Sequence, residues 1–118
     1  MARIVAFIPD LLFGSNVVGS LQAAGHEVAL VATPAGAAGA ELLIVDLTAE
    51  VPERLAAVAD AELPGVPKLA FYSHVEADVR RRALEAGFDL VVPRSRMARE
   101  GAQLADSLLR VRRSVDPS

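Results

Sequence analysis

Short apolar runs alternate with segments of helical spacing five times along this chain of 118 residues. Runs of three to five apolar residues, bounded by turn residues, are typical of strands buried on both faces of a parallel sheet. The runs cover residues 4–8, 28–32, 42–45, 69–72 and 90–92. Because parallel strands are joined by right-handed crossovers, this alternation predicts a parallel sheet with helices on both faces.

The segments between the runs carry helix signals. Apolar residues at helical spacing precede Gly25, which is suited to end a helix, and we expect Ser15 or Asn16 to cap its start. Pro52 is suited to the first turn of a later helix. The expected apolar face of that helix consists of Leu55, Val58 and Ala59. The expected apolar face of the last helix consists of Ala98, Gly101, Leu104, Leu108 and Val111.

The second connection is too short for an ordinary helix, because residues 36–40 are only glycine and alanine. We therefore predict a doubly wound α/β fold with a flavodoxin-like, five-stranded parallel sheet in the order 2-1-3-4-5 and a shortened second helix. Residues 1–118 form one domain of ordinary size. In this strand order, ligands bind at the carboxyl ends of the first and third strands, where Asp10 and Asp46 stand.

Composition excludes several classes of protein. The net charge of −3 argues against a general nucleic-acid binder. The chain has no cysteine and two histidines, so thiol chemistry and a histidine-rich metal centre are excluded. No apolar run reaches the roughly 18 residues that a membrane span needs. We expect a soluble, cytoplasmic protein that binds neither membranes nor nucleic acid.

Polar residues follow three successive strands at their carboxyl ends. Asp46 ends the third predicted strand, Ser73 and His74 follow the fourth, and Arg94 follows the fifth. Since these ends meet at one edge of a parallel sheet, the four side chains are expected to share one crevice with Asp10.

These residues resemble those of the response-regulator receiver (CheY-like) family along nearly the whole chain. Asp46 matches the phosphoacceptor, Ser73 the switch hydroxyl, and residues 83–89 (ALEAGFD) the end of a helix before the fifth strand. The resemblance implies a Mg²⁺ site that uses Asp10 and Asp46. The segments FYSHVEAD (71–78) and PRSRM (93–97) are similar to those of small stand-alone receiver-like proteins.

The chain also departs from the receiver pattern. Asp10 is the only candidate for the acidic pair that holds Mg²⁺ in the family, and the loss of a carboxylate weakens such a site. Arg94 stands at the lysine position and follows Pro93, whereas receivers place proline after the lysine. Arginine does not reproduce the geometry of lysine. These departures favour a pseudo-receiver.

Three functions follow as hypotheses. The first is a stand-alone pseudo-receiver that acts as a signalling or interaction module, without catalytic turnover and without a cofactor. It would dock to protein partners, including a second copy of itself, through the fourth helix, fifth strand and fifth helix that the resemblance implies. The second is a genuine phosphoacceptor in which Mg²⁺ assists phosphorylation of Asp46. The third is a binder of a small anion or nucleotide in a crevice lined by Asp10, Phe13, Asp46, His74 and Arg94.

Structural interpretations of the same residues stand beside these functions. Asp46 can cap backbone N–H groups at the strand end, and Ser73 with Glu76 forms a capping-box pattern. Arg94 can form an ion pair with Asp46 or Asp10 instead of clamping an anion, and we prefer the ion pair. The run Arg80–Arg82 is expected to lie on a solvated helix face with i,i+4 pairing.

Overall fold

The computed structural model describes residues 2–73 and 77–115. Its central sheet has five parallel strands in the order β2-β1-β3-β4-β5. The strands are β1 (Arg3–Phe7), β2 (Glu27–Leu30), β3 (Leu42–Leu47), β4 (Lys68–Tyr72) and β5 (Leu90–Pro93). The helices are α1 (Leu11–Ala23), η1 (Pro34–Ala37), α2 (Val51–Asp60), α3 (Ala77–Glu85) and α4 (Arg94–Val115). The predicted fold class, strand order and shortened second helix are confirmed.

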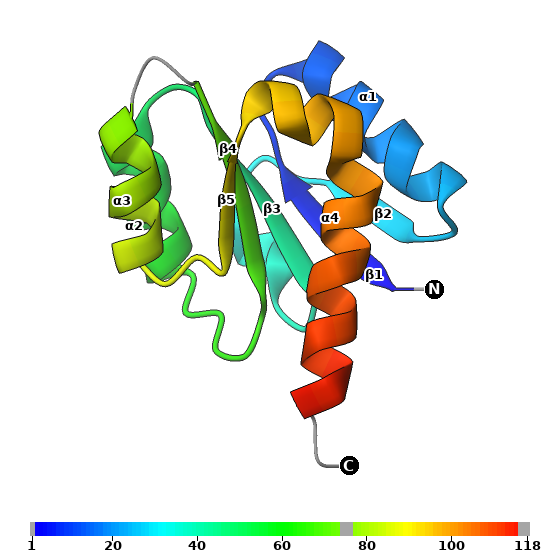
Figure 1. The fold of residues 1–118 in the computed structure, drawn as a ribbon. Helices are drawn as coiled ribbons and strands as arrows, with labels where there is room; N and C mark the ends of the chain where they lie inside the picture. Colours follow the sequence, from blue (N-terminus) through cyan, green and yellow to red (C-terminus); the bar gives the residue numbers. More distant parts are fainter. Residues whose placement is uncertain (1, 74–76, 116–118) are drawn as a thin grey trace.

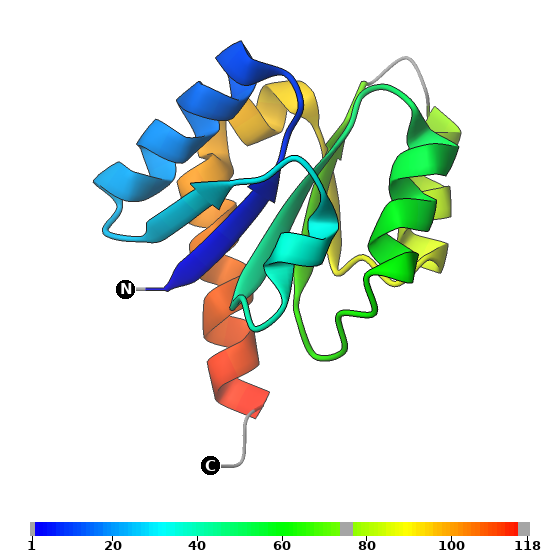
Figure 2. The ribbon, with the colours of Figure 1, turned by 180° about the vertical axis from the view of Figure 1, so that it is seen from behind.

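Helices cover the sheet on both faces. Figure 1 shows α1 and α4 on one face and α2 and α3 on the other. The view from behind shows that η1, a single 3₁₀ turn, stands in for a second full helix (Figure 2). The carboxyl ends of the strands lie together at the top of Figure 1, where α1 and α4 begin.

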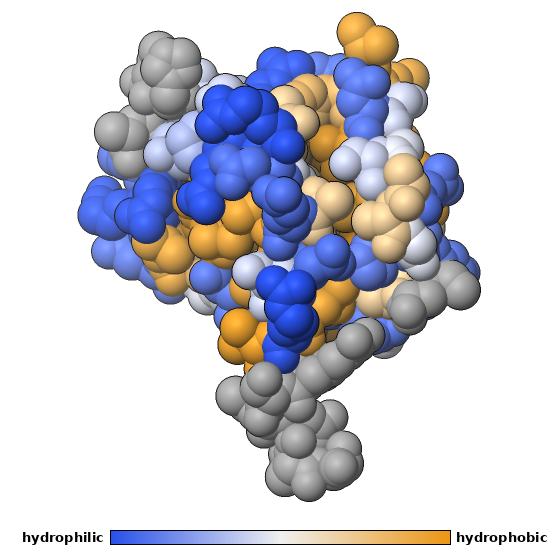
Figure 3. Space-filling view, turned by 45° about the vertical axis from the view of Figure 1, so that its right-hand side comes forward, coloured by the Kyte–Doolittle hydropathy of each residue, from blue (hydrophilic) through white to orange (hydrophobic). Residues whose placement is uncertain are grey.

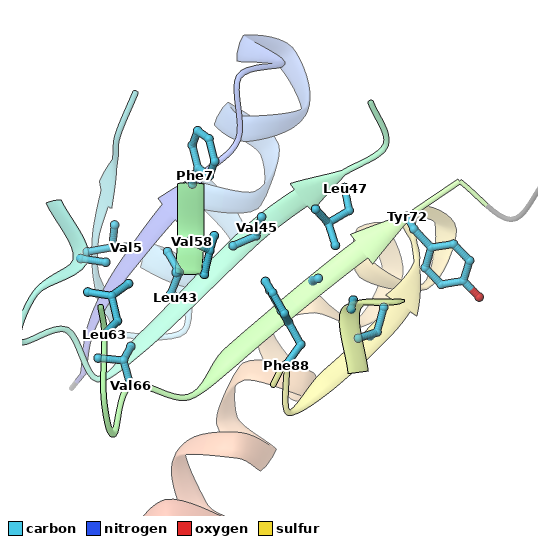
Figure 4. Close-up of a cluster of buried hydrophobic side chains, with 14 of the residues drawn as sticks. Val5, Phe7, Leu43, Val45, Leu47, Val58, Leu63, Val66, Tyr72 and Phe88 are labelled. Atoms are coloured by element: carbon cyan, nitrogen blue, oxygen red, sulfur yellow. The ribbon is translucent and has the colours of Figure 1, made fainter. Parts of the chain in front are cut away.

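Strand residues alternate between two apolar clusters, as the period of two in a strand requires. Leu43, Val45 and Leu47 of β3 pack in the cluster under α2 and α3, together with Phe88 (Figure 4). Leu42 and Ile44 of the same strand pack in the cluster under α1 and α4. The sheet is therefore buried on both sides, which explains the unbroken apolar runs of its central strands.

The first helix begins earlier than predicted. Asp10 is its N-cap, and its Oδ1 accepts a hydrogen bond of 3.0 Å from the backbone N–H of Phe13. The prediction of Ser15 or Asn16 as N-cap was wrong, because aspartate caps as well as serine or asparagine and Asp10 stands only three residues after the end of β1. Gly25 follows the end of the helix as predicted, with a φ of +95° in the left-handed region that favours glycine.

Two helices expose residues that were predicted to be buried. Ala59 of α2 and both Ala98 and Val111 of α4 are exposed. Arg54 and Met97 are buried instead. Alanine contributes little apolar area, so contacts of the larger side chains with the sheet decided how each helix is rotated.

None of the helices in the described part of the chain combines the length and the apolar character that a membrane span requires.

Candidate functional site

Those predicted site residues that the structure describes lie at the carboxyl edge of the sheet. Asp46 is the fifth residue of β3, which extends two residues beyond its predicted end. Asp10 caps α1, Ser73 follows β4, and Arg94 begins α4 directly after β5. His74, and the Glu76 of the predicted capping box, lie outside the described residues.

Asp46 is a buried carboxylate with only 2% of its surface exposed. Its Oδ1 accepts hydrogen bonds from the backbone N–H of Thr48 at 2.8 Å and from the Thr48 hydroxyl at 2.5 Å. The predicted role of Asp46 as a cap for the backbone at the strand end is therefore observed.

Arg54 of α2 supplies the cation beside Asp46. Its Nη1 lies 3.4 Å from Asp46 Oδ2 and donates a hydrogen bond of 2.9 Å to the Asp46 carbonyl oxygen. Its Nη2 donates to Glu50 Oε2 at 3.2 Å. The Arg54 side chain is itself buried, so water screens this pair little. One guanidinium thus ties the end of β3 to the first turn of α2.

Arg94 pairs with the other aspartate. Its Nη2 lies 3.4 Å from Asp10 Oδ2, and both side chains are about half exposed. Its guanidinium carbon lies 4.4 Å from the centre of the Phe13 ring, a cation–π arrangement. The preferred ion pair of Arg94 is observed, and of the two partners considered the structure selects Asp10.

An open cleft of about 550 Å³ lies at this edge of the sheet. Its lining residues are Phe13, Thr48, Ser73, Arg94, Ser95 and Ala98. The structure therefore brings Ser73 and Arg94 to one cleft, which Phe13 of α1 also lines. The Asp46 carboxylate is not part of the lining, because Thr48 and Arg54 enclose it.

The carboxylates present do not fit the ligand set of Mg²⁺. This ion prefers near-octahedral coordination by carboxylate oxygens, phosphate oxygens and water. The Oδ1 atoms of Asp10 and Asp46 accept hydrogen bonds, and each Oδ2 faces a guanidinium. In residues 2–73 and 77–115, no three His, Cys, Asp or Glu side chains are grouped to hold a metal.

Arg54 was not among the predicted site residues. Its spacing carried a signal: Val51, Arg54, Leu55 and Val58 follow the i, i+3, i+4, i+7 pattern of a buried helix face. A charged residue on such a face needs a partner of opposite charge. Asp46, the acidic residue near the end of β3, is that partner.

No family model matches the sequence, and no curated protein does. Solved structures do match. A CheY-like response regulator receiver domain protein from Methanospirillum hungatei JF-1 superposes with a TM-score of 0.81 at 19% identity, over 98% of this chain and 99% of that one. A response regulator receiver domain protein from Clostridium thermocellum gives 0.78 at 12% identity, over 98% and 100%.

A longer protein contains the same fold. NtrX from Brucella abortus, solved in complex with ADP, superposes with a TM-score of 0.79 at 15% identity over 95% of this chain. This chain spans 28% of the length of that protein. Identities this low establish the fold alone. The strand order, the shared edge of polar residues and these superpositions agree: the chain has the fold of a response-regulator receiver domain.

Proposed function

We propose that this protein is a receiver-like signalling module that docks to protein partners and does not accept a phosphoryl group. The observation that carries the proposal is the buried pair of Arg54 and Asp46. A carboxylate that attacks phosphorus needs a free oxygen and a metal that neutralises the charge of both reactants. Here Thr48 holds one oxygen, and a guanidinium that does not lose its proton faces the other.

The pair of Arg54 and Asp46 would also keep this site from changing its state. In a phosphorylated receiver, the new charge would change the state of the site, but Arg54 already compensates the charge of Asp46. The module would then hold one state at this site and have no catalytic turnover.

Titration with Mg²⁺ and then beryllofluoride, followed by amide NMR, tests this proposal. We expect no saturable shifts at Asp46, Thr48, Ser73 or β5, because neither the metal ligands nor a free carboxylate oxygen is in place. A receiver domain with the full acidic set, treated identically, is the positive control. Saturable shifts that need both reagents and disappear in Asp46→Asn would show a working phosphoacceptor and overturn the proposal.

We propose that docking uses the face formed by α3, β5 and α4. Arg80, Arg81 and Leu84 of α3 are exposed, and Arg81 pairs with Glu85 at 3.1 Å. Apolar area within a charged surround is typical of a partner surface. A second copy of the chain is the partner that can be tested directly.

Sedimentation velocity over a concentration series measures this self-association. We expect reversible dimers, and we expect Arg81→Glu to weaken them because it replaces an exposed cation of the proposed contact face with an anion. Glu53→Lys, an exposed charge reversal on α2, is the matched control and should leave the dimer unchanged. A chain that stays monomeric, or a dimer that is insensitive to Arg81→Glu, would argue against this face.

A further inference from the structure

Two hollows at the start of α1 and α4 share a wall. The first is the open cleft at the carboxyl edge of the sheet. The second is a more enclosed hollow of about 200 Å³ between α1 and α4. The second hollow is lined by Phe13, Asn16, Val17, Ser20, Met97, Ala98 and Gly101. Phe13 and Ala98 line both, so the two hollows are adjacent, and together they are called the groove below.

The cleft lobe contains a positioned cation, Arg94. Arg94 lies over the Phe13 ring and uses Nη2 for Asp10, which restricts its guanidinium without covering it, since 49% of the side chain stays exposed. A guanidinium presents five N–H donors in a planar fork that suits carboxylate and phosphate oxygens. Ser73 and Ser95 line the same lobe.

The hollow between the helices is lined mainly by apolar residues, with two polar ones, Asn16 and Ser20, and it contains the small residues Ala98 and Gly101. Ala98 and Gly101 lie on the side of α4 that faces α1, and a Cβ added to Gly101 would stand 3.2 Å from Met97 Cε. Figure 3 shows hydrophobic surface in the hollow between α4 and α1, bordered by polar surface. None of the residues of α1 (Leu11–Ala23) is charged.

We propose that this groove binds a small amphipathic oxyanion, with its carboxylate or phosphate on Arg94 and its apolar part between α1 and α4. The lobes of about 550 and 200 Å³ are together of the size that small-molecule sites have. An inorganic anion would fill only the cleft. A neutral apolar molecule would offer no anionic oxygen to accept hydrogen bonds from Arg94. The site does not use Asp46, so it is independent of whether that residue is phosphorylated.

Asp10 is expected to weaken the binding of an anion to Arg94. Its carboxylate stands 3.4 Å from Arg94 and repels an incoming anion. Asparagine keeps the N-cap of α1 but removes this charge. Asp10→Asn should therefore bind the oxyanion more tightly, by about threefold for a half-exposed pair, whereas a metal site would be weakened by the same change.

Hexanoate, hexyl phosphate, hexanol, acetate and inorganic phosphate are the probes, each titrated into the full chain and followed by amide NMR. We expect saturable shifts at Phe13, Val17 and Met97 with hexanoate or hexyl phosphate. Hexanol should bind about tenfold more weakly, because it lacks the charge-assisted bonds to Arg94. Acetate and inorganic phosphate should also bind more weakly, because they leave the apolar lobe empty. The ratio between hexanoate and hexyl phosphate identifies the preferred head group.

Three variants localise the binding. Arg94→Gln should lose about tenfold in hexanoate affinity and leave hexanol affinity unchanged. Ala98→Leu fills the junction of the two lobes and should weaken both probes. Arg99→Gln, an exposed position of α4 outside the groove, is the matched control and should bind as the unchanged chain does. The proposal is overturned by an absence of saturable shifts with hexanoate and hexyl phosphate, by equal affinities for hexanoate and hexanol, or by an Arg94→Gln variant that binds hexanoate normally.

Discussion

Arg54→Ala should lower the free energy of unfolding by about 3–5 kcal/mol, since it leaves the Asp46 carboxylate buried without its cation. The variant also removes the hydrogen bond from Nη1 to the Asp46 carbonyl oxygen. A domain of this size has a total stability of about 5–15 kcal/mol, so the loss is large. Urea unfolding monitored by circular dichroism measures it.

A double variant tests whether the loss of stability in Arg54→Ala comes from the unpaired charge of Asp46. Arg54→Met with Asp46→Leu removes both charges and should restore the stability to within about 1–2 kcal/mol of the unchanged chain, because apolar replacements of a buried ion pair are often tolerated. Arg81→Ala breaks an exposed pair with Glu85 and should cost less than about 0.5 kcal/mol. If Arg54→Ala were as mild as Arg81→Ala, the pair would not hold the end of β3, and the case for a closed phosphoacceptor site would fail with it.

Phe71→Ala should cost about 3–5 kcal/mol, because the ring is 1% exposed at the centre of the cluster under α1 and α4. The Phe71 ring centre lies 4.9 Å from that of Phe13, with an angle of 44° between the ring planes. Phe13 in turn supports Arg94. The loss of Phe71 should therefore also weaken hexanoate binding several-fold, measured by NMR titration at a temperature where the variant is folded.

Phe88 offers the matched control on the opposite face of the sheet. It is also buried, and it packs under α2 and α3, away from the groove. Phe88→Ala should lower stability by a similar amount and leave hexanoate affinity unchanged. Equal effects of both variants on affinity would mean that binding follows overall stability instead of the stack of Phe71, Phe13 and Arg94.

The architecture was predictable because it rests on patterns that are local in the sequence. The apolar runs of the strands and the glycine that ends α1 are each legible within a few residues, and right-handed crossovers leave few ways to join them. The absence of a full second helix was equally predictable, because residues 36–40 are too few and too small to form one.

The helix faces were less predictable. An alanine such as Ala59 or Ala98 fits either side of a helix at little cost, so spacing alone did not settle the rotation of α2 and α4. The larger side chains settled it through contacts with strands that lie far away in sequence.

The sequence by itself determined that Asp10, Asp46, Ser73 and Arg94 reach the carboxyl edge of the sheet, since each stands at or near the end of a strand. Only the tertiary structure decided how they pair. Arg54 reaches Asp46 from a helix whose rotation depends on packing, and this left Arg94 to pair with Asp10, 84 residues away in the sequence. Charge pairing depends on distances of a few ångströms between side chains, and those distances exist only once the strands and helices have packed together.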